Sequence, residues 1–244
     1  TQDASGRTQM VKQPITSRRA VYGETRVSGP LALIESTNDD KYLHLVVLLA
    51  SHECEAITTV YLNDEALTLD GSGNVTAPSR YANLVRVKKH LGTTDQTADT
   101  DLVSEVSGWT NQHRLRGIAY VYVRLEFSTD AFPNGIPNIS ALVQGKKLFD
   151  PRTSTTAYST NPALAVRDYL TDATYGFGAT ASEIDDAAFQ TAANICDESV
   201  TLAAGGSEDR YSCNGTIDSA NAPRGILEGL LTACGGVMTF TNGK

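Results

Sequence analysis

The side chains in this sequence with the strongest metal-binding chemistry are its histidines and cysteines. His52 and Cys54 are two residues apart, so on a strand they would share one face and could both ligate a metal ion. A structural zinc site needs four ligands, and no third or fourth ligand is identifiable beside this pair. His90 and His113 flank a polar segment and have no evident partner. We therefore predict no metal-binding residues.

Paired carboxylates are the second kind of candidate, because glycosidases use two acidic side chains about 5 to 9 Å apart. The sequence contains two adjacent aspartate pairs, Asp39 with Asp40 and Asp185 with Asp186, hereafter the two aspartate pairs. Side chains of adjacent residues usually point apart, and each pair lies where a turn or a helix N-terminus favours an acidic residue. We predict turn and capping roles for them, and no catalytic residues.

Glycine-rich segments and cysteines are the remaining candidates. The segments at 71–73 (GSG) and 205–207 (GGS) lack the lysine of a P-loop and the G-x-G-x-x-G pattern, so we expect turns and no cofactor-binding residues. The cysteines are widely spread without a CxxC pair, which favours buried free thiols in a reducing compartment. They are Cys54, Cys196, Cys213 and Cys234.

The composition limits the class of protein. The 244 residues are 41% hydrophobic, enough for one large domain or, as we prefer, two modest ones. A net charge of −8 and a pI near 5.0 argue against a protein that grips nucleic acid through phosphate contacts. The longest apolar run, residues 43–50, is far shorter than the ~20 residues of a membrane span, so we predict none. The sequence begins without Met or a secretory signal, and we expect both ends to be cuts.

The first half of the chain has the pattern of an antiparallel β domain. Residues 1–19 are polar and basic and are expected to form an extended arm. Residues 42–50 are apolar at nearly every position, which is typical of a central strand covered on both faces. We predict a compact, mainly antiparallel β domain, barrel-like or sandwich-like, over 20–154, with a polar excursion at 68–117. The expected strands are 22–27, 31–35, 42–50, 56–62, a short one around Leu67, 84–90 and 119–127, and residues 139–149 are expected to form a further strand or a hairpin.

Two of these strands carry polar side chains on one face. Arg86 and Lys88 point outward together, which predicts either a solvated face or an interface to an acidic partner. Alternation places Tyr120 and Tyr122 on the outer face of a half-buried strand. Such tyrosines either are exposed, as a carbohydrate-binding module would need, or pack under a neighbouring loop or subunit.

The second half has a mixed α+β pattern. Asn161 can cap a helix that begins at Pro162, and the sequence YGFG at 175–178 ends it. The helix is expected to be amphipathic, and the segment 161–178 to form a joint between two domains. We therefore predict an α+β chain in which a smaller α+β domain, residues 155–244, follows the barrel-like β domain.

Further helices and strands are expected after this joint. The S-x-x-D pattern at 182–185 predicts the start of a second helix. Its inward stripe is expected to contain Ile184, Ala188, Ala192 and Ile195. Pro223 opens a third helix. Its inward residues are expected to be Ile226, Leu227, Leu230, Leu231 and Cys234. Strands are expected at 211–219 and 237–240.

Several long phrases of the sequence resemble the phage tail tip hub family of the host-specificity protein J type. The resemblance runs in order from about Arg18 to Lys244. The phrases are RRAVYGETRVSGPLALIES, DKYLHLVVLLASHECEAITTVYLNDE, VRVKKHLGT, GWTNQHRLRGIAYVYVRLEF, FPNGIPNISALVQGKKLFDPRT, NPALAVRDYLTD, YGFG, RYSCNGTID and PRGILEGLLTACGG.

The resemblance implies a structural, non-enzymatic protein of the virion at the distal end of the tail. Proteins of this family are homotrimers below the ring of the distal tail protein, with the tape measure protein and other tail tip proteins as partners. They link the tail tube to the central fibre, and DNA passes through their channel without specific binding. Contact with the host receptor is expected from regions beyond Lys244.

Two other classes of function remain open at this point. A tail-associated glycan or peptidoglycan hydrolase would use the two aspartate pairs in a cleft. A carbohydrate-binding β-module would use exposed Tyr120 and Tyr122. The loops at 70–83 and 128–138 are expected to carry contacts to neighbouring subunits if the hub interpretation holds.

Overall fold

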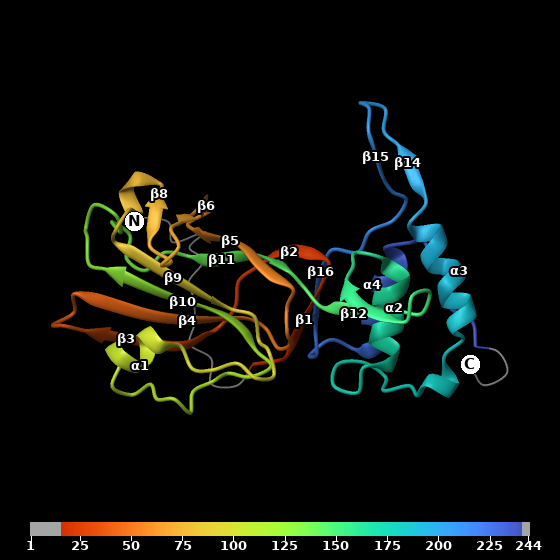
Figure 1. Cartoon of the computed structure of the whole chain (residues 1–244), viewed down its shortest axis with the longest axis horizontal. Helices are drawn as coiled ribbons and strands as arrows, with labels where there is room; N and C mark the ends of the chain where they lie inside the picture. Colours follow the sequence, from red (N-terminus) through yellow and green to blue (C-terminus); the bar gives the residue numbers. More distant parts are fainter. Residues whose placement is uncertain (1–15, 241–244) are drawn as a thin grey trace, which may run out of the picture. The chain divides into compact units, whose positions relative to one another are not determined.

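The computed structural model describes residues 16–240, which form two compact units (Figure 1). Unit 1 comprises residue 16 and Arg26–Val143. Unit 2 comprises Ser17–Thr25 and residues 144–240. The predicted α+β class is confirmed, since unit 1 is mainly antiparallel sheet and unit 2 mixes helices with short hairpins.

The boundary between the two units lies between residues 143 and 144, whereas the sequence predicts a domain boundary between residues 154 and 155. The hairpin at 147–158 lies in unit 2, which also contains the first strand of the chain. The expected arm at 1–19 lies mostly outside the described residues, and Arg19 already begins a strand. Among the residues described, no helix has the length and apolar character required to cross a bilayer.

The first sheet of unit 1 has four antiparallel strands in the order β3-β4-β10-β9. Their bounds are β3 (Leu31–Thr37), β4 (Tyr42–Ala50), β9 (Val85–His90) and β10 (Ala119–Glu126). Because β4 pairs with β3 on one edge and β10 on the other, and is buried along most of its length, the predicted central strand is confirmed.

The second sheet of unit 1 has the order β2-β11-β5-β6, and a separate small hairpin joins β7 to β8. The bounds are β2 (Glu24–Val27), β5 (Ala56–Leu62), β6 (Glu65–Ala66), β7 (Thr68–Leu69), β8 (Val75–Ala77) and β11 (Ile139–Gln144). Within residues 16–240 neither sheet closes into a barrel. The unit is therefore built from two open antiparallel sheets whose buried residues form its core.

Strand β10 is buried on both faces, so the prediction of a half-buried strand was wrong. The face of β10 that was expected to be solvent-exposed is covered by α1 (Thr100–Glu105) and the loop that follows it. These residues come from the polar excursion, which places a short apolar surface over the sheet. The cluster contains Val46, Leu102, Val106, Trp109, Tyr120 and Tyr122.

Unit 2 is organised around helix α2 (Pro162–Thr171), which packs against α3 (Asp186–Cys196), α4 (Pro223–Thr232) and β12. β1 (Arg19–Tyr22) pairs with β16 (Gly215–Asp218), and β12 (Lys147–Asp150) with β13 (Thr155–Tyr158). The core includes Tyr22, Leu148, Leu164, Tyr169, Cys196, Ile226 and Leu230. The inward stripe predicted for α4 is confirmed, with Ile226, Leu227 and Leu230 buried.

The cap predicted for α2 is confirmed, but the expected joint is not. The Asn161 Oδ1 atom accepts hydrogen bonds from the Ala163 and Leu164 N–H groups, at 3.0 and 3.3 Å. Residues 162–167 are all buried, so this helix is a central element of unit 2 rather than an amphipathic connection between units.

Helix α3 begins later and faces another way than expected. Its N-cap is Asp185, while Ser182 lies in a preceding 3-10 turn, Ala181–Glu183. The residues that pack inward are Phe189, Ala192, Ala193 and Cys196, whereas Ile195 is exposed. The buried stripe is therefore displaced by about one position from the predicted one, with Ala193 and Cys196 buried in place of Ala192 and Ile195.

Three expected strands also differ from the structure. The strand expected at 22–27 is interrupted at Gly23, whose φ is +61° and where a Cβ atom would lie 2.1 Å from the Cys213 carbonyl oxygen. Of the segment 211–219 only Gly215–Asp218 pairs as a strand. Residues 237–240 are exposed and form no strand.

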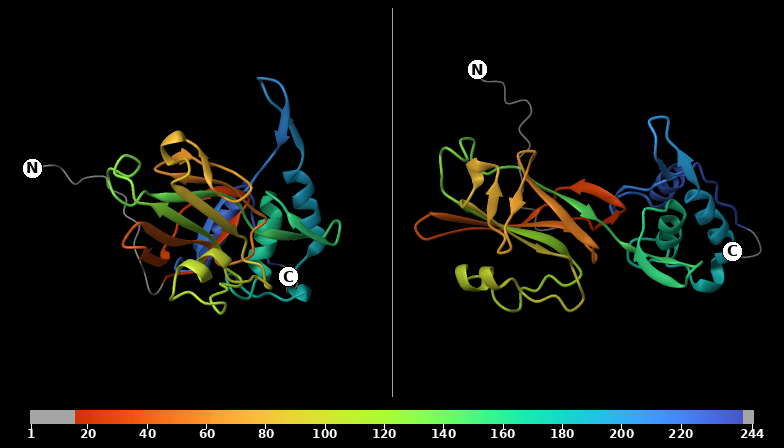
Figure 2. Two further views of the ribbon diagram at one scale, coloured as in Figure 1. Left: turned by 60° about the vertical axis from the view of Figure 1, so that its left-hand side comes forward. Right: turned by 45° about the horizontal axis from the view of Figure 1, so that its top comes forward.

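A hairpin that the pattern did not predict follows α3. It consists of β14 (Ser199–Thr201) and β15 (Ser207–Asp209), and all six strand residues are exposed. Figures 1 and 2 show that it projects away from the helices of unit 2.

Candidate functional site

The two aspartate pairs have the turn and capping roles that the sequence predicts. Asp39 and Asp40 lie in the turn between β3 and β4 with positive φ angles of 53° and 63°. Asp185 Oδ1 accepts hydrogen bonds from the first N–H groups of α3, and Asp186 forms an ion pair with Arg167 at 2.7 Å. Asp40 lines the groove at the β3–β4 end of unit 1 together with Glu126, where it accepts a hydrogen bond from the Ser36 hydroxyl at 2.6 Å and Glu126 pairs with Lys41 at 3.4 Å.

The glycine-rich segments are also turns, as predicted. Asp70 Oδ1 accepts from the N–H groups of Ser72 and Asn74, both at 2.8 Å, which closes the loop around Gly73. Gly205 and Gly206, with φ of 89° each, form the bend of the β14–β15 hairpin.

His52 and Cys54 lie in the bend after β4 rather than on a strand. The Cys54 Sγ atom is 3.9 Å from His52 Nδ1, and burial raises the pKa of the Cys54 thiol to about 12. Over the described part of the chain, no group of three or more His, Cys, Asp or Glu side chains is arranged to hold a metal ion.

A polar cluster of unit 1 lies between the first sheet and α1. Its centre is His44, which is fully buried on β4. The His44 Nδ1 and Tyr122 hydroxyl are 2.8 Å apart, and its Nε2 lies 2.8 Å from Thr37 Oγ1. Burial lowers the pKa of His44, so the neutral ring is the favoured form near pH 7.

Arg86 connects this cluster to α1. Its guanidinium donates to Glu105 Oε1 at 2.7 Å and to the Tyr122 hydroxyl at 3.3 Å. Burial would raise the pKa of Glu105, but the hydrogen bond and charge of Arg86 outweigh it and the net pKa is lowered. Lys88 pairs with Asp101 at 3.4 Å. The acidic partner predicted for Arg86 and Lys88 is therefore α1 of the same chain. The alternative prediction, that these two side chains form a solvated face, was wrong.

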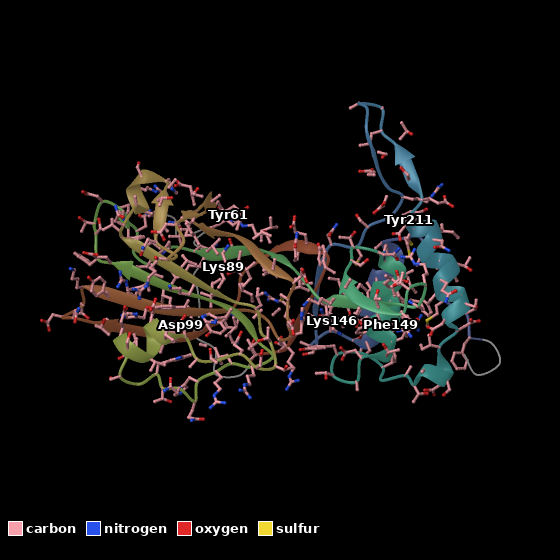
Figure 3. The ribbon with its side chains drawn as sticks, in the orientation of Figure 1. Tyr61, Lys89, Asp99, Lys146, Phe149 and Tyr211 are labelled. Atoms are coloured by element: carbon pink, nitrogen blue, oxygen red, sulfur yellow. The ribbon has the colours of Figure 1, made fainter. Side chains whose placement is uncertain are left out.

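His90 has a partner that the sequence did not reveal. Its Nε2 lies 2.7 Å from Asp99 Oδ2, and its ring stacks on Tyr120 with centroids 4.3 Å apart. Asp99 (labelled in Figure 3) also caps α1 by accepting from the Leu102 N–H. Because Tyr120 and Tyr122 are both 0% exposed, they are packed under a loop, and the exposed tyrosines of a carbohydrate-binding module are excluded.

His113 likewise has neighbours within the excursion. Its ring stacks on Trp109 with centroids 4.9 Å apart, and its Nδ1 accepts a hydrogen bond from the Thr110 N–H at 2.9 Å. These contacts make the expectation of no partner wrong for both histidines, and they give each a role in holding the excursion on the sheet.

Unit 2 contains a separate buried ion cluster that sequence reasoning missed. Lys146 (labelled in Figure 3) donates to Asp168 Oδ2 at 2.7 Å and hydrogen-bonds Asp172, while the Tyr22 hydroxyl donates to Asp168 at 2.6 Å. Burial alone would lower the pKa of Lys146, but the two carboxylates raise it. Asp168 and Asp172 are four residues apart on or just after α2, and this i, i+4 spacing of acids is the one signal in the sequence that could have indicated a shared cation.

One apolar groove lies at the β3–β4 end of unit 1, with a volume of about 310 Å³. Its lining includes Ser36, Leu43, Leu125, Phe127, Phe132 and Ile136. Phe127 is 74% and Ile136 47% exposed, so this surface leaves large apolar side chains in water. Phe132 also stacks on Tyr81, with centroids 5.6 Å apart, which joins the loops 70–83 and 128–138.

The side chains of both clusters connect elements within their own unit. The cationic residues of both clusters are paired with carboxylates of the same unit. The Tyr22 hydroxyl is bonded to Asp168 and the Tyr122 hydroxyl to His44, whereas the buried Tyr120 hydroxyl has no hydrogen-bond partner among the described residues.

Comparison with known proteins finds a curated phage protein that is similar to part of the chain. No protein-family model matches the chain. The tip attachment protein J of Escherichia phage SECphi27 is 28% identical over 183 residues, which cover 66% of this chain and 15% of that protein. The chain thus spans a small part of the relative's length. Among solved structures, a chain from the virion of a native gene transfer agent particle has a TM-score of 0.41 and 19% identity, covering 59% of this chain and 31% of that one.

Proposed function

We propose that this chain is part of a structural protein of a phage tail, located in the virion at the distal end of the tail. The observation that carries the proposal is the similarity to a tip attachment protein over 183 residues. The geometry supports a non-enzymatic role, because the charged side chains of both polar clusters form ion pairs within their own unit or cap a helix.

The finer proposal is a tail tip hub. Three copies of the full-length protein would form a ring that closes the tail, beneath the distal tail protein and in contact with the tape measure protein and other tail tip proteins. The hub would link the tube to the central fibre and take part in host attachment and DNA ejection. A trimer would also cover sheet edges that an isolated β domain leaves open.

The net negative charge of the chain is suitable for a protein that surrounds a channel and lets DNA pass through it without binding the DNA. Its net charge of −8 repels the phosphate backbone. At physiological salt this repulsion acts over about 8 Å, which discourages adhesion across a narrow channel.

The loop 128–138 is the surface we assign to subunit contacts. It borders the apolar groove, where Phe127 and Ile136 are exposed. A neighbouring subunit would bury these side chains, and each fully buried side chain of this kind stabilises an interface by about 1.5–3 kcal/mol. The loop 70–83 is less open, because Tyr81 is buried against Phe132.

The first test is the mass of the purified full-length protein by light scattering, followed by electron-microscope class averages along the particle axis. A trimer with a ring and a central hole is expected. A monomer with a single cleft would refute the hub and favour a hydrolase. Labelling of intact particles with antibodies against this chain tests the location separately, and labelling away from the tail tip would refute it.

A further inference from the structure

Two asparagine residues in the described part of the chain are followed by glycine, and the structure gives them different surroundings. Asn134 and Gly135 lie in the loop 128–138, which borders the apolar groove of unit 1. Asn214 and Gly215 lie in unit 2, where the chain enters β16. An asparagine before glycine is prone to ring closure between its side-chain amide and the next backbone nitrogen, because glycine has no Cβ atom to block the approach. The same chemistry is therefore available in two settings.

The side chain of Asn134 can rotate toward Gly135. It is exposed, and within residues 16–240 its amide has no hydrogen-bond partner. A Cβ atom placed on Gly135, whose φ is +84°, would meet no atom within 4 Å, so the space beside this peptide is open. The Gly135 N–H donates to the Phe132 carbonyl oxygen at 3.1 Å, and this turn bond must open before the nitrogen reacts. Because the turn is exposed, the loop does little to keep the two groups apart.

The side chain of Asn214 is held in place. Its Oδ1 atom accepts a hydrogen bond from the Glu24 N–H at 2.8 Å, and its Nδ2 atom donates to the Ser212 hydroxyl at 3.4 Å. Gly215 pairs with Tyr22 in the β1–β16 sheet. A Cβ atom on Gly215 would also meet no atom within 4 Å, so open space does not distinguish the two sites. The restraint on the asparagine side chain does.

We propose that Asn134 is a modification site that converts to aspartate and isoaspartate in the folded chain. The Gly135 backbone nitrogen attacks Asn134 Cγ and a C–N bond forms. The side-chain nitrogen leaves as ammonia and takes the proton of the Gly135 N–H. Water then opens the cyclic imide at either of its carbonyl carbons. In sum, asparagine plus water gives aspartate or isoaspartate plus ammonia, so the step needs no oxidant or reductant.

The conversion adds a negative charge to the loop and, in the isoaspartate product, one methylene to the backbone. Asp40 and Glu126 already line the groove beside it, and the lining cation, Lys41, is paired with Glu126 at 3.4 Å. A second copy that buried this groove, as in the proposed function, would therefore bind the converted loop less well. A neighbouring subunit would also cover the loop, so the conversion belongs to the unassembled chain.

The test is ageing of the purified chain, kept dilute and monomeric, at mildly alkaline pH under native conditions. Peptide mapping and enzymatic methylation of isoaspartate follow each site. Asn134 should convert at least roughly ten times faster than Asn214, since two hydrogen bonds and the strand pairing must open at the second site. In guanidinium chloride the two rates should agree within about threefold, because unfolding removes the restraint on Asn214. Asn242, which also precedes a glycine, lies outside the described residues and is mapped separately.

Asn134→Gln is the matched variant, because it keeps the amide and lengthens the side chain by one methylene, which makes ring closure far slower. It should abolish isoaspartate in the peptide that contains position 134 and leave conversion at Asn214 unchanged. Equal rates at Asn134 and Asn214 in the folded chain, or conversion of Asn134 only after unfolding, would overturn the proposal.

The effect on assembly is measured apart from the modification, because it rests on the proposed function. In the full-length protein, Asn134→Asp should weaken the association of copies by roughly tenfold in light scattering, whereas Asn134→Gln should not. Association unchanged by Asn134→Asp would refute the contact assigned to this loop. A parent protein that stays monomeric would refute the hub instead, and conversion of its Asn134 in the ageing experiment would still support the modification site.

Discussion

Replacement of Lys146 by Met would remove the cation of the buried cluster in unit 2 and leave its carboxylates in place. The Lys146, Asp168 and Asp172 side chains are 18%, 17% and 14% exposed, so solvent screens their charges only in part. Removal of one partner from a buried ion pair typically costs 3–5 kcal/mol, and the residual exposure places this site near the lower end, about 3 kcal/mol. The midpoint of urea unfolding should fall by roughly 1 to 2 M.

The loss should depend on pH in a defined direction. Burial raises the pKa of Asp172, but hydrogen bonds from Lys146 and from backbone N–H groups outweigh it and lower the pKa below the ordinary value. A carboxylate with a lowered folded-state pKa stabilises the fold above its unfolded pKa of about 3.9, and that contribution is lost as the pH falls through the folded value. The difference between Lys146→Met and the parent chain should therefore be largest at pH 7 and shrink below about pH 4.

The assay can follow each unit by its own probe. Thiol labelling of the buried Cys196 and Cys213 reports on unit 2, in a Cys54→Ala background, and fluorescence of Trp109 reports on unit 1. Arg224→Met, which removes an exposed ion pair with Glu228, is the control and should not shift the midpoint. A loss below about 1 kcal/mol for Lys146→Met, or a loss equal at both pH values, would refute the reasoning.

Three further predictions concern single elements. Tyr122→Phe removes the hydroxyl between His44 and Arg86 and should cost about 1–3 kcal/mol in urea unfolding followed by Trp109 fluorescence, whereas an unchanged midpoint would mean that the cluster contributes nothing. Asn161→Ala should destabilise unit 2 by about 2 kcal/mol and Asn161→Ser by less, since Ser keeps the cap and loses only the bonds to α3; equal losses in thiol labelling would contradict a capping role. Asn at all four positions of the two aspartate pairs should leave any cell-wall degradation by purified particles unchanged, and loss of degradation would favour a hydrolase.

The elements that the sequence predicts well are those specified by local chemistry. Strand β4 is apolar along its length, α2 begins with a cap and a proline, and α4 shows a regular apolar stripe. Each pattern is contained in a short window, so no knowledge of distant segments is needed. The turn roles of the two aspartate pairs and of the glycine-rich segments were predictable for the same reason.

The errors come from contacts between distant segments. The outer face of β10 carries the tyrosines of a half-exposed strand, and only the fold shows that α1 covers it. A helix of six residues is too short to be stable alone, so its sequence gives a weak signal and its formation depends on the sheet beneath it. The same holds for Tyr22 and Asp168, which are 146 positions apart. His44 offered one clue, since a buried polar residue in an apolar strand requires a partner.

The pairing of β1 with β16 has a consequence for the order in which the chain folds. Residues 19–22 are made early but find their partners at 215–218, so unit 2 is interrupted in sequence by the whole of unit 1. During synthesis at about 5–20 residues per second, unit 1 can be complete while the first strand of unit 2 still waits for its partner. The early strand must stay free of wrong pairings over this interval, and the sharp bend at Gly23 separates it from the sheet that forms first.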